Sequence, residues 1–465
     1  MLALHKYSGF GDQTKSYTIR SVQEDIDMLK SCDTVVALSN ATVDNQVIFG
    51  KNSDRSAVEC QPLVLRGRKS HLPDSVTNCQ FIQLPEVRTT YRHIGSTPYW
   101  CWGDEHGFNE HQVVIGNEGL GSKYEFDSPK LIGMELVRLG LERASTAAEA
   151  VEVMTTLITK YGQGKFSNQA NVRTYDNGYI IADPREAYIL ETAGHEWAAK
   201  RVDSVAGISN VYSIEDDWDC LSPMALEHAI ADNWWMEKSE QFNFAEAYSH
   251  QADRSVGSGA IRRRRSCTLL NQHLGNIDIP TTMAVLSDHG GDDADKTSFD
   301  TMIKQGGICV HHDQDGTGGN TATSLVAHLC ADNSRLPVYW CSFYSPCLGV
   351  FLPMFIEGEL PPVLAIGNEE PSDESPWWLF RQLSLQSRSG KIGSISTIQE
   401  RWKRFQKCLF ESAYKIAKAS RELIDDQCQA EAKQLLTKYM AENVEVMLKT
   451  VREMLTGTSA SDTRR

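Results

Sequence analysis

The sequence predicts an α+β fold built in layers, and the order of its apolar segments carries this prediction. Short apolar runs typical of buried strands come first, two helical segments follow, and a meander of further strands comes next. The regular alternation of strand and helix that indicates βαβ units is not seen. With 465 residues, of which 41% are apolar and 23% charged, the chain can bury a large core.

The first predicted element is a hairpin of two buried strands. Residues 34–38 form an apolar run, Asp44 and Asn45 supply turn chemistry, and residues 46–50 return. Because the two strands run back along each other, the residues after the second strand should lie near the start of the first.

Another buried strand is expected at 113–116, before two helices. Ser128 caps the first helix and Pro129 opens it. The second helix begins at Thr146, with an acid at capping-box spacing, and ends near Gly162. The meander should then contain three strands, at 178–182, 187–191 and 197–199.

The C-terminal part of the chain has a different character. Prolines and acids dominate the stretch after residue 352, which is typical of a loop or linker. From about Thr397 apolar residues recur at helical spacing, and such a stripe usually packs on the parent domain, more rarely in a dimer contact. The predicted organisation is a lead or pro-segment at 1–31, a main domain at 32–352, a linker at 353–396, a helical region at 397–456 and a disordered tail at 457–465.

Charge and composition exclude several classes of function. The formal net charge of −15 disfavours nucleic acid and anionic membrane surfaces as partners. No apolar run approaches the roughly 20 residues that span a bilayer. The N-terminus lacks the apolar core of a signal peptide and carries acids that a transit peptide avoids, so a cytoplasmic protein is predicted.

The cysteines and histidines predict neither a metal site nor a cofactor. The twelve cysteines form no CxxC pair and no Cys/His zinc spacing, which favours reduced thiols over a disulfide framework. His311 and His312 could ligate a metal. Adjacent residues of a strand point to opposite faces, however, and the loop offers no third ligand in phase.

Cys32 stands at the start of the first predicted strand and allows two interpretations. The common one is a small buried thiol. The functional one is a nucleophile, and a thiol with a pKa of roughly 8.5 needs a base to become a thiolate at neutral pH. No histidine flanks Cys32, but a cut before it would free an α-amine with a pKa of roughly 7.7–8.0 that could serve as this base.

The predicted hairpin brings Lys51 and Asp54 near residue 32. The lysine would favour a thiolate, and the acid could hold an ammonium group. The alternative is an ordinary solvated strand end.

Three side-chain amides and one arginine could supply the rest of a site. Asn109 and Asn117 flank the strand at 113–116, and Asn210 follows the meander. Amides at such positions are common, and they are also the neutral donors that an oxyanion hole requires. Arg262 opens a run of four arginines, which either faces solvent or contributes one side chain that clamps a carboxylate.

In combination, these segments resemble the secernins, which belong with the cysteine dipeptidases of the N-terminal nucleophile hydrolase superfamily. The resemblance covers about residues 31–350 in order. It rests on Cys32-Asp33-Thr34-x-Val36-Ala37-Leu38 and on segments 41–45, 48–55, 102–103, 109–111, 115–118, 131–143, 160–164, 191–194, 197–199 and 208–210.

This resemblance implies a four-layer α-β-β-α sandwich and a site at the start of the first strand. Cys32, freed by removal of the preceding residues, would attack the carbonyl of a small peptide or amide. Asp54 would orient the new N-terminus. Asn109 and Asn210 fall where relatives carry the amides for the oxyanion and the tetrahedral intermediate.

The resemblance also assigns residues to substrate binding. Lys51 stands where relatives place an arginine, and Asn117 belongs to a matching segment. A late arginine of the relatives corresponds to Arg262 or to a neighbour in the run 262–265.

A rival function within the same family is a catalytically inactive protein that acts by interaction in exocytosis. Its binding surface, or a homo-oligomer contact, would be the C-terminal helical region. Asp54, Asn109 and Asn210 beside Cys32 favour catalysis, because a binding module has no need of all of them.

Overall fold

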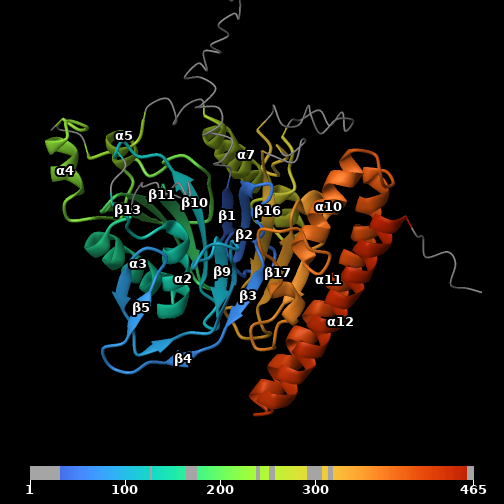
Figure 1. Ribbon diagram of the computed structural model, residues 1–465. Helices are drawn as coiled ribbons and strands as arrows, with labels where there is room; N and C mark the ends of the chain where they lie inside the picture. Colours follow the sequence, from blue (N-terminus) through green and yellow to red (C-terminus); the bar gives the residue numbers. More distant parts are fainter. Residues whose placement is uncertain are drawn as a thin grey trace, which may run out of the picture.

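The computed structural model describes residues 32–125, 128–163, 175–236, 241–250, 257–290, 306–312 and 318–457. It confirms the predicted α+β class, with two large antiparallel sheets and helices on both sides (Figure 1). The predicted lead at 1–31 and all but the first residue of the predicted tail at 457–465 lie outside the described residues. Within the described part, no helix combines the length and the apolar character needed to cross a membrane.

The six-stranded sheet contains the predicted hairpin. Asn45 has a positive φ of 57° in the turn, which asparagine tolerates better than most residues. Asp33 pairs with Asn52, so the end of the second strand lies beside the start of the first. The strand order is β14 (Val205–Ile208), β1 (Asp33–Ala37), β2 (Ile48–Ser56), β16 (Gly319–His328), β17 (Val338–Phe343) and β18 (Leu352–Met354).

The eight-stranded sheet contains the predicted meander, which forms β11 to β13. The strand order is β15 (Cys220–Leu221), β13 (Glu196–Arg201), β12 (Ala187–Ala193), β11 (Asp176–Ala182), β10 (Val114–Leu120), β9 (His106–Asn109), β8 (His93–Ser96) and β3 (Leu63–Arg66). Two small ribbons pair β4 (Lys69–Ser70) with β7 (Thr89–Thr90) and β5 (Val76–Asn78) with β6 (Gln83–Pro85).

Successive side chains of the eight-stranded sheet point to opposite faces and pack in two different hydrophobic cores. On β10, Ile115 packs in the core that includes α2 (Gly133–Arg143) and α3 (Ala147–Tyr161). Its neighbour Val114 packs in the core that includes β1. This sheet therefore has helices on one face and the six-stranded sheet on the other.

The six-stranded sheet is covered in the same way. Gly50 of β2 faces α8 (Ile279–Leu286), whereas the side chains of Phe49 and Lys51 approach Gly116 of β10. Helix α7 (Ser258–Gln272) contacts β1 and β14. The layer order is therefore α-β-β-α. Two short helices, α4 (Ala225–Ala231) and α5 (Phe244–Tyr248), follow β15 along the chain.

The start predicted for the first helix is wrong, and the second helix is as predicted. Helix α2 begins at Gly133, not at Ser128 or Pro129, because the Glu135 carboxylate accepts the Ile132 N–H and fixes the cap there. For α3, the Thr146 side chain caps the start, and the chain leaves the helix at Gly162, which has a φ of 76°.

The stretch 353–396 does not form the predicted linker. It contains η3 (Pro362–Ala365) and α10 (Pro376–Arg388), and Pro376 occupies the first turn of α10, where proline is favoured. The adjacent Trp377 is fully buried and donates its indole N–H to the Ala322 carbonyl of β16 at 2.8 Å. Proline thus starts a packed helix here: it lacks an N–H, and an N–H in the first turn would have no helical partner in any case.

The predicted C-terminal helical region forms α11 (Ile395–Asp425) and α12 (Gln429–Thr456). Helix α11 contacts β17 and β18, and α12 contacts β18 and α10. The hairpin of α11 and α12 therefore packs on the edge of the six-stranded sheet (Figure 1). This is the common use of an amphipathic stripe that the sequence favoured.

Candidate active site

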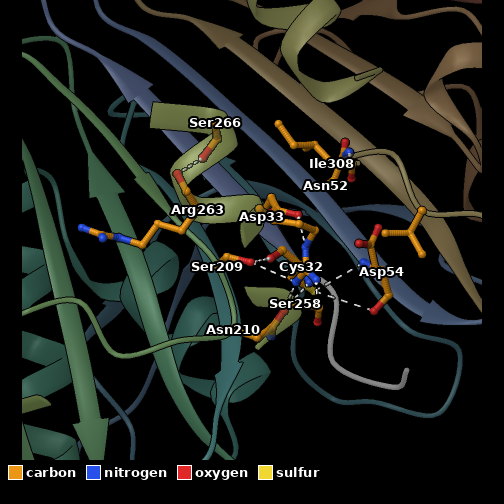
Figure 2. Close-up of polar contacts among 12 residues, drawn as sticks. Cys32, Asp33, Asn52, Asp54, Ser209, Asn210, Ser258, Arg263, Ser266 and Ile308 are labelled. Atoms are coloured by element: carbon orange, nitrogen blue, oxygen red, sulfur yellow. Dashed lines mark hydrogen bonds and ion pairs between the residues drawn. The ribbon is translucent and has the colours of Figure 1, made fainter. Parts of the chain in front are cut away.

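Cys32 immediately precedes β1, between residues contributed by the two strands that flank β1. Its backbone nitrogen donates to Asn210 Oδ1, just beyond β14, at 2.8 Å. On the other side, Asp54 of β2 donates its backbone N–H to Cys32 Sγ at 3.3 Å. Figure 2 shows Cys32 between these two side chains. The strand order β14-β1-β2 thus brings together three predicted site residues that are distant in the sequence.

Asp54 keeps one carboxylate oxygen without a hydrogen-bond partner among the described residues. That atom is Oδ2, while Oδ1 accepts from Thr321 Oγ1 of β16 at 2.5 Å. Burial, reinforced by the charge of nearby Asp33, raises the pKa of the Asp54 carboxyl well above its usual range. A positive charge placed beside Oδ2 would offset both effects.

Arg262 is the arginine of the run 262–265 that lies at this site. Its Nε lies 2.9 Å from Asp33 Oδ2. Its Nη2 donates to Ser209 Oγ at 2.9 Å and to Asn210 Oδ1 at 2.7 Å. Arg262 therefore clamps a carboxylate, which is one of the two outcomes expected for this run, and it orients the amide that binds the Cys32 nitrogen.

Close packing of α7 puts Arg262 in place. A Cβ atom at Gly259, in the first turn of α7, would lie only 2.8 Å from the Asn210 backbone, so the absence of a side chain lets the helix approach. One helical turn further on, Arg265 points away and pairs with Asp288 at 2.9 Å.

Lys51 is buried between the two sheets. Its Nζ donates to the Asn117 carbonyl at 2.5 Å and pairs with Glu118 Oε1 at 3.2 Å, and both charged side chains are 0% exposed. A Cβ at Gly116 would lie 3.1 Å from Lys51 Cδ, so glycine leaves room for the lysine stem. Burial alone would lower the pKa of Lys51, but the Cys32 thiol and the surrounding carboxylates raise it.

The thiol itself is poorly suited to act while residue 31 remains attached. Burial raises the pKa of Cys32, Lys51 lowers it, and three nearby carboxylates raise it, so that the pKa is about 12. Among the described residues, the thiol's hydrogen bonds are both to the main chain of Asp54. The Cys32 nitrogen lies next to this thiol and is held by Asn210 Oδ1.

Comparison with known proteins identifies the segment that carries these contacts. Residues 31–262, about half of the chain, match the model of Peptidase family C69. This stretch begins one residue before Cys32 and ends at Arg262, so it includes Asp54 and Asn210, whereas Thr321 lies beyond it.

Relatives of the C69-like segment include a curated protein and solved structures. A probable dipeptidase of Latilactobacillus sakei is 24% identical over 235 residues, which span 46% of this chain and 45% of that relative. The alignment thus covers less than half of that protein's length.

Similar solved structures include a mutant of conjugated bile acid hydrolase from Clostridium perfringens, with 13% identity, a TM-score of 0.39, and coverage of 67% of this chain and 89% of that chain. Penicillin V acylase from Agrobacterium tumefaciens has 14% identity, a TM-score of 0.38, and coverage of 70% and 86%.

The structure does not bring Asn109 to the C69-like site, so its predicted role is wrong. Its Nδ2 donates to the carbonyls of Leu141 and Ala144, and its Oδ1 accepts the N–H groups of His111 and Val113. Asn109 therefore lies at the start of β10. The Asn210 amide contacts Gly119 near the other end of β10, and the two ends of a strand of this length are roughly 20 Å apart. The sequence places amides around this strand but does not say which end carries the site.

Asn117 lies close to the site without opening into it. Its side-chain amide is 2.9 Å from Asn177 Oδ1, and its carbonyl is bound by Lys51. Both predicted substrate-binding residues of this sheet interface are therefore engaged with protein groups.

Four further residues complete the contacts around Cys32, and the sequence prediction assigned none of them a role. Glu118 pairs with Lys51 and accepts the Thr34 hydroxyl, Asp33 pairs with Arg262, Ser209 donates to the Cys32 carbonyl at 3.1 Å, and Thr321 binds Asp54. Glu118 is the charged residue of the buried strand β10, and this was a usable signal for it. Thr321 comes from the distant strand β16 and had no such signal.

Proposed function

We propose that this chain is a secernin-like cysteine dipeptidase with an N-terminal nucleophile. It would hydrolyse small peptide or amide bonds through Cys32 after cleavage of the bond between residues 31 and 32. One observation carries the proposal: the Cys32 nitrogen and thiol lie between Asn210 and Asp54, 2.8 Å from the amide oxygen and 3.3 Å from the Asp54 nitrogen.

The freed α-amine of Cys32 would act as the general base. Its pKa, roughly 7.7–8.0 in unperturbed chains, lets it take the thiol proton near neutral pH. The ammonium ion so formed would bind Asn210 Oδ1, which already accepts from this nitrogen, and Asp54 Oδ2, which has no partner among the described residues.

The thiolate would then attack the carbonyl carbon of the substrate. The tetrahedral intermediate collapses when the ammonium returns its proton to the departing amine, which leaves a thioester on Cys32. Water, deprotonated by the same amine, hydrolyses the thioester, releases the acid and restores the thiol.

Lys51 and Arg262 would act as positioning residues in this reaction. Lys51 lowers the pKa of the Cys32 thiol through its charge. Arg262 holds Asn210 Oδ1 at 2.7 Å and offsets the charge of Asp33. Asn210 orients the amine through Oδ1; one hydrogen of its Nδ2 goes to the Gly119 carbonyl at 2.8 Å, and the second would be the donor for the tetrahedral intermediate.

Mass spectrometry combined with an assay of dipeptide hydrolysis tests the proposal. The expected result is a mature chain that begins at Cys32 and releases amino acids from dipeptides, while Cys32→Ser abolishes release. The exposed Cys408 offers a matched control, since Cys408→Ser removes a thiol far from the site and should keep full activity. Turnover by a chain that still carries residues 1–31, or undiminished turnover by Cys32→Ser, would refute the mechanism.

The same geometry favours the rival function for an uncut chain. With residue 31 attached, Cys32 is 5% exposed and its nitrogen is an amide, which is not a base. A form of the protein that is never cut would therefore be catalytically idle, and only an interaction role would remain for it.

A further inference from the structure

We propose that His289, Cys309, His311 and Cys347 form a structural zinc site. One ligand atom from each residue lies within 4.8 Å of all the others. His311 Nε2 is the centre of the group, at 3.3 Å from His289 Nε2, from Cys309 Sγ and from Cys347 Sγ. This His/Cys cluster is separate from the Cys32 site, and the proposal does not depend on the proposed function.

The distances fit a tetrahedral zinc ion. Zinc binds imidazole nitrogen at about 2.0–2.1 Å and thiolate sulfur at about 2.3 Å, so ligands at tetrahedral corners are about 3.4 Å apart for two nitrogens and about 3.5 Å for nitrogen and sulfur. The three distances of 3.3 Å around His311 Nε2 agree with these edges.

Hydrogen bonding does not account for the same arrangement. An imidazole nitrogen either donates one hydrogen or accepts through one lone pair, both in the plane of the ring. His311 Nε2 therefore cannot satisfy one nitrogen and two sulfur atoms at once. A cation bound at the centre of the four ligand atoms satisfies all of them.

The ligands come from three separate segments of the chain. His289 follows α8, Cys309 and His311 precede β16, and Cys347 lies in η2 (Pro346–Leu348), between β17 and β18. Cys309 and His311 are two residues apart, so in extended chain they share one side. Cys309 is thus an in-phase partner of His311, and the segment after α8 and the short helix η2 supply the other two ligands.

The surroundings of His311 suit a metal ligand. Its other ring nitrogen, Nδ1, lies 3.4 Å from Ser345 Oγ, and Ser345 in turn lies 3.2 Å from Asn320 Nδ2 and from Ser384 Oγ. Such contacts fix the ring orientation of metal-binding histidines. His311 and Cys309 are 2% and 4% exposed. His289 and Cys347 are half-buried. Four protein ligands leave no open coordination position, so the site is structural and not catalytic.

The charges and protons balance when Zn²⁺ binds to these four residues. The two thiols lose their protons to solvent, the two histidines bind as neutral rings, and the two thiolates neutralise the Zn²⁺ charge. Affinity should therefore fall as the pH is lowered, because protons compete for the thiolates.

The position of the cluster links it to Asp54. Val310, between Cys309 and His311, donates its N–H to Thr321 Oγ1 at 3.0 Å and accepts the Thr321 N–H at 3.1 Å. The same hydroxyl donates to Asp54 Oδ1. An ion that fixes the chain on both sides of Val310 would therefore also fix the hydrogen bond that orients Asp54.

Metal analysis of the full chain tests the site. Protein produced with zinc in the medium should hold one zinc ion per chain after gel filtration. Replacement of zinc by Co²⁺ should give the visible d–d bands and the sulfur-to-cobalt charge-transfer band of a tetrahedral site with thiolate ligands. Zinc-supplemented protein that is free of metal, or cobalt protein without charge-transfer absorption, would overturn the proposal.

Variants assign the ligands. After each protein is diluted 100-fold, Cys347→Ser and His289→Ala should each hold at least tenfold less zinc per chain than the wild type. Cys60→Ser, which removes another buried thiol at 3.9 Å from Ser375 Oγ, should retain it and serves as the matched control. Equal loss of zinc in Cys60→Ser would contradict the assignment.

A measurement on the wild-type chain covers the case in which a ligand variant fails to fold. A chelator should lower the melting temperature, and stoichiometric Zn²⁺ should restore it. A disulfide between Cys309 and Cys347 in freshly purified, metal-free protein would refute the site, because neither sulfur could then bind zinc.

Discussion

Two regions of this chain gather cysteine with charged or ionisable partners, and they differ in those partners. Around Cys32 lie one lysine, one arginine and several carboxylates, and the thiol's hydrogen bonds are to the main chain of Asp54. In the His/Cys cluster, two thiols meet two histidines within 4.8 Å. The first set can hold and move protons once an amine is present, and the second can hold a soft metal ion. The chemistry of a cysteine is thus decided by its neighbours.

Of the substitutions that test this difference between the two regions, Cys32→Ala should have the largest effect on activity. Loss of the nucleophile should reduce dipeptide hydrolysis by at least roughly 10³-fold, because no other group can form the thioester. Zinc content should stay at the wild-type level, since the cluster shares no residue with the site. Activity assays and metal analysis on the same preparation check both outcomes, and a joint loss of activity and zinc would show that the regions are not independent.

The reactivity of the Cys32 thiol sharpens the comparison further. In the uncut chain, burial raises the pKa of Cys32 to about 12. At pH 8 the thiolate fraction is then roughly 10⁻⁴, about 10³-fold below that of an ordinary thiol.

Alkylation of Cys32 by iodoacetamide, followed by peptide mapping, should accordingly be slow at pH 8 and rise about tenfold per pH unit up to the protein's alkaline limit. The mature chain should react faster at pH 8, because the amine supplies the base. Rapid alkylation of the uncut chain at pH 7 would contradict the structural reason given for its inactivity.

Removal of the buried Lys51 ammonium tests how much this cation stabilises the carboxylates around Cys32. Lys51→Met leaves Glu118 without its ion-pair partner at 3.2 Å, which should lower the free energy of unfolding by about 3–5 kcal/mol. The double variant Lys51→Met/Glu118→Gln should recover most of this loss, because no unpaired charge remains. Urea unfolding of the three proteins measures the difference, and equal stability of the single and double variants would argue against the pair.

Asp54→Asn should have a smaller effect, confined to catalysis. The amide can still accept the Thr321 hydroxyl through its oxygen, so the fold should persist. It no longer attracts the ammonium at Oδ2, and we expect kcat/KM to fall roughly 10²-fold. Asp44, which is exposed and pairs with His328 away from Cys32, provides a control: Asp44→Asn should keep activity.

The smallest expected effect belongs to the second region. Ser345→Ala removes the hydroxyl 3.4 Å from His311 Nδ1 and should weaken zinc affinity roughly tenfold without removing a ligand. Competition with a chromogenic chelator measures the affinity. Ser389→Ala, an exposed serine beyond the end of α10, is the control and should bind zinc as the wild type does.

Much of the Cys32 site could be predicted because it depends on a local hairpin. The apolar runs at 34–38 and 46–50 and the turn at Asn45 fix the pairing of β1 with β2, and that pairing sets Asp54 beside Cys32. Asn210 and Arg262 required the resemblance, since β14 and α7 reach the site only through the order of the sheet.

Two predictions are wrong, each for its own physical reason. The resemblance and the amides around the strand at 113–116 place Asn109 at the site, but a strand has two ends and the pattern of apolar residues does not label them. The stretch 353–396 was assigned to a linker because proline disfavours helix interiors, whereas Pro376 occupies a first turn, where it does no harm.

The sequence by itself determined the α+β class, the hairpin, the meander and the C-terminal helices, because periodicity and turn chemistry act between residues close in the chain. Only the tertiary structure decided that Lys51 faces Glu118 across the sheet interface, that Arg262 and not Arg265 reaches Asn210, and that four ligands from three segments converge on one point. These contacts join residues from different strands and helices. Their distances depend on sheet order and layer packing, which no local pattern records.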